Sequence, residues 1–273
     1  MAEAREITIA ISSANLTETT QTDGRHRRHM ATTILGLSRG WQMRNPLAIR
    51  GREFRAVLKG EDPRINDPFS LEPGSVFADG LRPIDAPEDF PLDWQQWFQR
   101  ITAVNAMVVA TIDDEKISKA EGNAMADQWA RSHHELALYM RDSRTPKEHV
   151  RANALARLIS DMSEEITSAA TDAGLDQGQL TAWLESRLER DLVHMPYLGR
   201  HFEVIHQRLS NADDRWEAND LTDINYLACA AGYAHIVVGE KKISEYLQRI
   251  APRVSGGAFI CRKLPDAVEY LQS

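Results

Sequence analysis

The chain has 273 residues, of which 42% are hydrophobic and 26% charged; this balance suits one large or two small globular domains and excludes wholesale disorder. The net charge of −8 opposes long-range attraction to nucleic acid and argues against a general nucleic-acid coat protein. The apolar runs fall far short of the roughly 20 residues of a membrane span, and the first residues do not form a signal-type apolar stretch. We therefore expect a cytoplasmic protein that does not contact a membrane.

The amino-terminal segment predicts a strand followed by helix. Residues 6–11 (EITIAI) are β-branched and apolar, which is typical of a short buried strand. Ser12 and Asn15 are helix-cap types, and helix is expected from Leu16 to Leu37 with an interruption at Asp23-Gly24.

Residues 45–92 hold seven of the eleven prolines and few periodic apolar positions. This composition predicts a long loop with short elements. Such a loop is too long for an ordinary connection, so it is either functional or wraps the surface.

From Trp94 to Leu209 the apolar residues recur at helical spacing, and we expect several helices. Trp94, Trp97 and Phe98 fall on one face and are expected in a core, whereas His133-His134 is expected to be exposed. The breaks between helices are expected at Thr145-Pro146, Gly174 and Pro196.

The carboxy-terminal segment predicts a parallel sheet with crossover helices. A helix is expected to open at Asn219 and to stop at Gly232. The elements that follow are a strand at 235–239, a helix at 243–250, a strand at 258–261 and a short helix from Pro265. The two cysteines, Cys229 and Cys261, each lie in an apolar run and are expected to be small buried residues with free thiols.

Three acidic residues lie at predicted strand–helix junctions. Glu18 follows the first strand, Asp223 lies in the first turn of the helix that leads to strand 235–239, and Glu240 follows that strand. Ligands of parallel sheets bind at the carboxyl ends of the strands. Carboxylates gathered there would be ligands for Mg²⁺ or Mn²⁺. The alternatives are a solvated helix residue for Glu18, a dipole-stabilising residue for Asp223 and a surface turn for Glu240.

Two stretches resemble the PIN-like nucleases. The stretch ITIAISSANLTE is similar to that family's strand, serine pair and acid-bearing helix, and NDLTDINYLACAAGYAHIVVGEK is similar to its third acidic motif. With the preceding MPYLGRHFEVIHQRL, the chain resembles a bacterial PIN-like subfamily with a long helical insertion. The resemblance covers roughly residues 6–40 and 194–250.

The resemblance implies an α/β fold in which the two chain ends form a PIN-like parallel sheet core around a large all-helical insertion. The expected divisions are 1–40, 41–93, 94–210 and 211–273, with the first and last as the two halves of the core. The implied activity is divalent-metal-dependent hydrolysis of phosphodiester bonds, most often by an endoribonuclease, and a toxin or defence effector is one role by analogy.

Carried over by position, the catalytic acids would be Glu18, Asp220, Asp223 and Glu240, of which Glu18, Asp220 and Asp223 would hold Mg²⁺ or Mn²⁺. Asp220 matches the subfamily motif either as a ligand or as a helix cap.

A basic run follows Glu18. Arg25, Arg27 and Arg28 could contact the phosphates of RNA, or of DNA, since no feature of the sequence reads a 2′-hydroxyl. The same run could instead form an exposed basic face.

One departure from the family stands out. PIN-like cores begin with a central strand that ends in aspartate, and by this resemblance we expect the chain to start at the second strand. In an alternative alignment residues 7–11 are the first strand, and Ser12 then stands in place of the aspartate. A late start of the gene model, a strand supplied by a partner chain and a degenerate core are the alternatives. A homo-oligomer and an inhibitor protein are further partners that the sequence leaves open. The rival function is therefore a catalytically degenerate PIN-like binding or assembly module.

Overall fold

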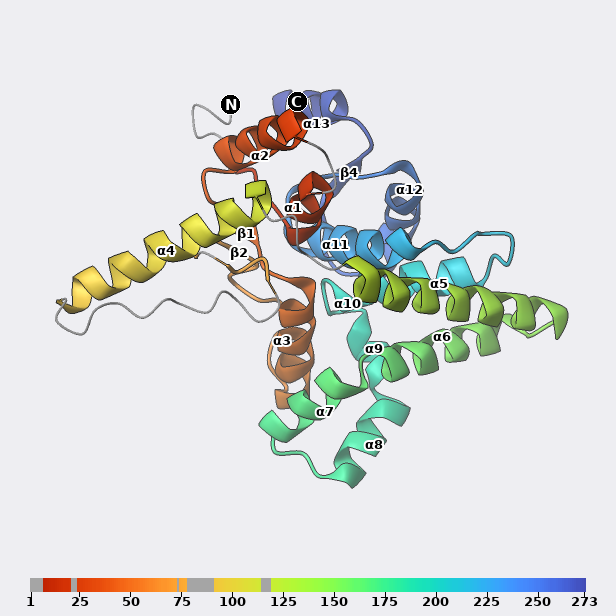
Figure 1. Cartoon of the computed structure of the whole chain (residues 1–273). Helices are drawn as coiled ribbons and strands as arrows, with labels where there is room; N and C mark the ends of the chain where they lie inside the picture. The colour runs from red at the N-terminus through yellow and green to blue at the C-terminus, as the bar shows by residue number, and fades with distance from the viewer. Residues whose placement is uncertain (1–6, 21–23, 73, 78–90, 114–118) are drawn as a thin grey trace. The chain divides into compact units, whose positions relative to one another are not determined.

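In the computed structural model, residues 7–20, 24–72, 74–77, 91–113 and 119–273 are described, and they are mostly helical with two short sheets (Figure 1). The chain forms two compact units. Unit 1 comprises residues 1–48 and 67–118, and unit 2 comprises 49–66 and 119–273. The units cut across the expected divisions, because the first long helix after residue 90 belongs to unit 1 and the later helices belong to unit 2.

Unit 1 contains three helices and a small sheet among its described residues. They are α1 (Ser13–Thr20), α2 (Gly24–Ser38), β1 (Gln42–Met43), β2 (Phe69–Ser70) and α4 (Leu92–Asp113). The expected helix interruption at Asp23-Gly24 is confirmed at Gly24, where α2 begins with a φ of 45°. Asp23 lies outside the described residues.

The expected strand at 6–11 is reduced to a single bridge. Ile11 pairs in parallel with Gln42 of β1, its N–H donating to Trp41 and its carbonyl accepting from Met43. Among the described residues, 7–10 pair with no strand, and Glu6 lies outside them. β1 also pairs antiparallel with β2. Buried Ile11, Leu16 and Val76 form a core cluster of unit 1.

The prediction of a long loop over 45–92 is wrong at its start, because Pro46–Lys59 forms the helix α3. The side chain of Asn45 accepts a hydrogen bond from the backbone N–H of Leu47 at 2.9 Å, and Pro46 follows as the first helical residue. A capping side chain before a proline at the first helical position is a strong start signal. The proline content of the whole segment concealed it.

Unit 2 is built mainly of helices, and the expected helical character of this part of the chain is confirmed. They are α5 (Lys119–Asp142), α6 (Lys147–Asp161), α7 (Ser163–Asp172), α8 (Gln177–Ser186), α9 (Leu188–Leu192) and α10 (Leu198–Leu209). The expected breaks at Thr145-Pro146, Gly174 and Pro196 all fall between helices.

Helix α10 lies at the centre of unit 2, where it packs against α5, α6, α11 and α12. Its side chains are buried around most of the circumference, from Leu198 to Leu209. A helix that is covered on all sides is a core element. Charged residues on it, such as Arg200 and Arg208, must therefore find partners inside the protein.

A buried glutamate joins α3 to the start of α10. Glu53 is fully buried, and its carboxylate accepts the backbone N–H of Tyr197 at 2.8 Å and that of Leu198 at 2.9 Å. The hydroxyl of Tyr233 donates to the same carboxylate at 2.6 Å. The first backbone N–H groups of a helix have no hydrogen-bond acceptor within the helix. At the start of α10 the carboxylate of Glu53 is that acceptor.

The carboxy-terminal βαβ prediction is confirmed. The elements are α11 (Ala218–Tyr233), β3 (Ile236–Val238), α12 (Lys241–Ile250), the 3₁₀ turn Ala251–Arg253, β4 (Phe259–Cys261) and α13 (Leu264–Gln272). β3 and β4 are parallel, with Val237 opposite Ile260, and α12 makes the crossover between them. Cys229 and Cys261 are buried with free thiols, as expected. In the described part of the chain no helix combines the length and apolar character of a membrane span.

Candidate functional site at the carboxyl end of β3

The first turns of α11 and α12 meet beside the carboxyl end of β3. The ammonium of Lys242, in the first turn of α12, lies 3.3 Å from Oδ1 of Asp220, in the first turn of α11. Strand β3 ends at Val238, and α12 begins three residues later at Lys241. This contact places the acidic start of α11 at the edge where parallel sheets bind ligands.

Asp220 belongs to a buried ion-pair network. The guanidinium of Arg208 lies 2.8 Å from Asp220 and 2.8 Å from Asp214, and Lys242 lies 3.2 Å from Asp214. Two carboxylates are thus balanced by two cations. Tyr246 donates a hydrogen bond to Asp214 at 2.8 Å, and burial together with this bond raises the pKa of Tyr246 to about 12.

Asp220 is also a helix cap, one of the two roles that the sequence left open for it. Its carboxylate accepts the backbone N–H of Glu217 at 2.6 Å, and the Glu217 side chain caps the helix in return. With Arg208, Lys242 and this N–H around it, the buried carboxylate already has its hydrogen-bond and charge partners.

Aromatic rings pack against Arg208 on one side of the ion-pair network. The Arg208 guanidinium lies 4.0 Å from the ring centroid of Trp216, which packs against Trp129 and His133. The expectation that His133 is exposed is wrong, because only 1% of it is accessible. Burial lowers the pKa of His133 to about 4, so the ring is neutral at pH 7.

Asp223 and Glu240 lie closer to solvent than Asp220. Asp223 is half-buried one turn further along α11, where the side-chain amide of Asn219 lies 3.4 Å from its carboxylate. Glu240 is exposed and caps α12, accepting the backbone N–H of Ile243 at 3.3 Å. The sequence predicted both at this edge, and β3, α11 and α12 form where it expected them.

The remaining predicted residues lie in unit 1. Glu18 is exposed on α1, and Arg25 and Arg28 are exposed on α2. Arg27 is buried on the same helix.

The donor chemistry at the β3 edge fits a hard divalent cation only in part. Asp223 and Glu240 offer carboxylate oxygens, which Mg²⁺ and Mn²⁺ prefer. Asp220 does not fit as a ligand, because Arg208 and Lys242 hold its oxygens. Over the described residues, no group of three or more His, Cys, Asp or Glu side chains is arranged to hold a metal ion.

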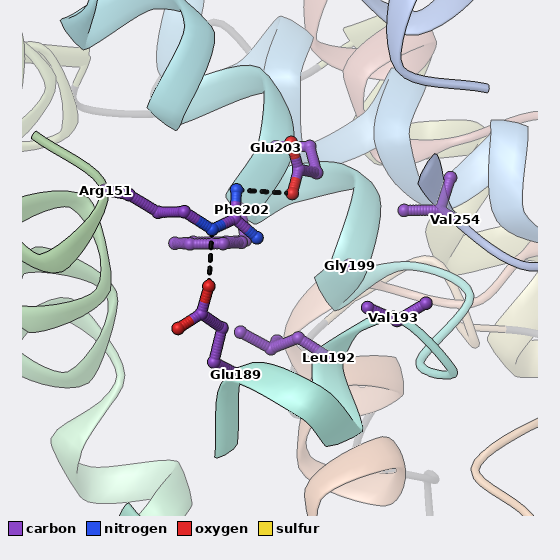
Figure 2. Close-up of a pocket in the computed structure, with 8 residues that line it drawn as sticks. All are labelled: Arg151, Glu189, Leu192, Val193, Gly199, Phe202, Glu203 and Val254. Carbon is purple, nitrogen blue, oxygen red and sulfur yellow. Dashed lines mark hydrogen bonds and ion pairs between the residues drawn. The ribbon is translucent and has the colours of Figure 1, made fainter. Parts of the chain in front are cut away.

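A depression elsewhere in unit 2 is too small for a ligand site. Arg151 lies over Phe202 between Glu189 and Glu203, as Figure 2 shows. The space among the lining side chains is about 160 Å³, whereas ligand pockets usually hold roughly 300–1,000 Å³. The guanidinium of Arg151 is paired with both carboxylates, so this is a structural ion-pair cluster.

Sequence reasoning missed Arg208, Lys242 and Asp214, which fix the site. A signal was present in Arg208, which adjoins the apolar positions Ile205 and Leu209 of its helix, because a charged residue beside a buried face requires a buried partner. Comparison of the chain with models of protein families, with curated proteins and with solved structures finds no significant match.

Proposed function

We propose that this protein is a divalent-metal-dependent phosphodiesterase that cleaves nucleic acid, with RNA as the first substrate to test. The observation that carries the proposal is the contact between Lys242 and Asp220, which brings the acidic start of α11 to the carboxyl end of β3. The PIN-like resemblance of residues 219–240 falls on this same segment. Two independent considerations therefore point to one edge of the sheet.

The proposal gives the acidic residues different roles. Asp223 and Glu240 would be metal ligands, and a bound Mg²⁺ or Mn²⁺ would polarise a phosphoryl oxygen or an attacking water. Asp220 would be a positioning residue, because its pairing with Arg208 and Lys242 fixes the start of α11 relative to α12. Glu18, on α1, keeps the ligand role implied by the resemblance, and its own variant tests it.

The basic residues of α2 would contact substrate phosphates. Arg25 and Arg28 are exposed and can reach a ligand in solvent, whereas Arg27 is buried and is assigned a structural role. A toxin or defence role and an inhibitor protein belong to the proposal through the resemblance alone.

The test uses the full chain with fluorescent single-stranded RNA and DNA in Mg²⁺ or Mn²⁺. We expect metal-dependent cleavage of RNA that is abolished by EDTA and reduced at least 100-fold in Asp223→Asn and in Glu18→Gln. Glu240→Gln is expected to reduce cleavage less, because its carboxylate also caps α12. The matched control is Glu185→Gln, an exposed acid on α8, which should cleave like the wild type.

Two results would contradict the proposal. One is cleavage at equal rates by the wild type and Asp223→Asn, which would indicate a contaminating nuclease. The other is the absence of metal-dependent cleavage of either nucleic acid by folded wild-type protein.

A second candidate function is a non-catalytic binding or assembly module. The observation that favours it is the neutralised state of Asp220, since a carboxylate held by Arg208 and Lys242 is poorly disposed to bind a metal. It predicts no cleavage in any metal but retained RNA binding in EDTA, weakened by Arg25→Gln and Arg28→Gln and unchanged in Asp223→Asn.

A further inference from the structure

Helix α4 of unit 1 carries an apolar stripe that faces solvent. Trp94, Trp97, Ile101 and Val104 expose 58%, 57%, 46% and 43% of their surface. The expectation that both tryptophans lie in a core is therefore wrong. Their rings touch each other edge to face, with centroids 5.8 Å apart, so part of the stripe is already ordered.

The rest of unit 1 packs on a different face of α4. Gln95, Gln99, Thr102 and Ala103 are half-buried, and α4 contacts α1 and α2. At 100° per residue these four positions lie on the side of the helix away from the stripe. The helix is thus held by one face, and its most apolar face is left to solvent.

The spacing of the stripe is that of a two-helix seam. The steps from Trp94 to Trp97, Ile101 and Val104 are three, four and three residues, which is the a/d pattern of a coiled coil. A partner helix of the same pattern can place its side chains between those of α4.

The charges of α4 argue against two other partners. The sequence of α4 contains one basic residue, Arg100, and two acidic ones, Asp93 and Asp113. Helices that bind a membrane surface carry several Lys or Arg on their polar face, and stacking platforms for nucleic acid lie in basic grooves. An uncharged apolar seam fits another apolar helix.

The area of the stripe is enough for pairing between two copies. Two tryptophans exposed by more than half, with Ile101 and Val104, offer on the order of 400–500 Å² per chain. Together with the flanking polar side chains, two copies would bury on the order of 1,000 Å², the lower limit for a specific interface. We propose that α4 pairs with α4 of a second copy of this chain through Trp94, Trp97, Ile101 and Val104, forming a homodimer.

The test measures the mass of the full chain by light scattering after size exclusion and by sedimentation over a concentration series. We expect roughly twice the chain mass of 30.8 kDa for the wild type. The double variant Trp97→Gln/Ile101→Gln should associate at least tenfold more weakly, because it places amides in the seam. Gln96→Ala, an exposed polar position on the same helix, is the matched control and should remain dimeric. Circular dichroism verifies that the variants fold.

Three results would overturn the proposal. They are a wild-type chain that stays monomeric up to about 100 µM, a dimer unaffected in the folded double variant, and a monomer whose tryptophan emission shifts to the blue on neutral phospholipid vesicles. The last would assign the stripe to a lipid surface. None of these results bears on the cleavage of RNA, so the homodimer proposal and the nuclease proposal are tested independently of each other.

Discussion

The guanidinium of Arg208 lies 2.8 Å from the carboxylate of Asp220, and neither side chain exposes more than 4% of its surface. The pair joins α10 to the start of α11, and Lys242 extends it to α12. A charge buried at this depth is tolerated only with a partner, so the network fixes how three helices meet beside β3.

The first prediction concerns the removal of one charge from this pair. Asp220→Asn should lower the free energy of unfolding by about 2–4 kcal/mol, because Arg208 and Lys242 lose a buried partner while Asp214 remains. Asp223→Asn, at a half-buried position of the same helix, should cost less than about 1 kcal/mol. Urea unfolding at pH 7 measures both. Equal losses would show that Asp220 has no special structural role.

The second prediction follows from the burial of Glu53. Burial raises its pKa to about 7, although hydrogen bonds from Tyr233, Leu198 and Tyr197 oppose the rise. Because the folded pKa lies above the unfolded value of 4.5, the folded state binds more protons between these two values. The free energy of unfolding should therefore fall as pH rises from 4.5 to 7, by roughly 3 kcal/mol from this group alone.

Glu53→Gln isolates this contribution because the amide does not titrate. Its NH₂ also faces a backbone N–H, so the variant should be less stable than the wild type at pH 5 by about 1–3 kcal/mol. The difference should shrink as pH rises to 7.5, where the wild type carries an ionised buried carboxylate. Chemical denaturation of both proteins across this range is the measurement, and a difference independent of pH would exclude the titration of Glu53.

Local sequence patterns predicted the helices and strands whose formation depends on residues that are close in the sequence. The strands around Val237 and Ile260 are short apolar runs bounded by turn residues, and their spacing indicated the crossover helix between them. The same reasoning predicted Glu240 directly after β3, where it caps α12, whereas Asp223 lies one turn beyond the first turn of α11 in which it was expected. The sequence-based prediction failed for α3. The many prolines of residues 45–92 indicated a loop, and the helix-capping signal at Asn45-Pro46 was given less weight.

Tertiary relationships were beyond the reach of such patterns. Asp220 pairs with residues 12 positions before it and 22 positions after it, and nothing in a single sequence reports such a pairing. Helical spacing showed that Trp94 and Trp97 share a face, but whether that face is covered depends on what packs against it. The burial of His133 likewise depends on the residues that pack against it, which a single sequence does not report.

The third prediction compares two glycines inside helices of unit 2. A Cβ at Gly232 of α11 would lie 2.6 Å from the carbonyl oxygen of Pro196, which is backbone and cannot move aside. Gly232→Ala should therefore destabilise the protein by about 3 kcal/mol. A Cβ at Gly51 of α3 meets nothing within 4 Å, so Gly51→Ala should stabilise it by about 0.5–1 kcal/mol. Thermal unfolding should shift in opposite directions, and a shift of the same sign in both would contradict the packing of α11 against Pro196.

The fourth prediction concerns Glu203, whose carboxylate lies 2.8 Å from Arg151 and 3.3 Å from Arg253 (Figure 2). Burial raises the pKa of Glu203, but hydrogen bonds from His206, Arg151 and Arg253 outweigh burial and hold the pKa at about 2. The folded pKa lies below the unfolded one, so this stabilisation is present above pH 4.5 and is lost as pH falls toward 2.

Glu203→Gln should therefore be less stable than the wild type by about 2–3 kcal/mol at pH 7, and the difference should vanish near pH 2. Glu189→Gln is the matched control, because Glu189 pairs with the same Arg151 but its side chain is 53% exposed. An exposed ion pair contributes less than about 1 kcal/mol. Denaturant titrations at pH 7, 4 and 3 compare the three proteins. If Glu189→Gln cost as much as Glu203→Gln at pH 7, the expectation that the buried ion pair of Arg151 contributes more than its exposed one would be wrong.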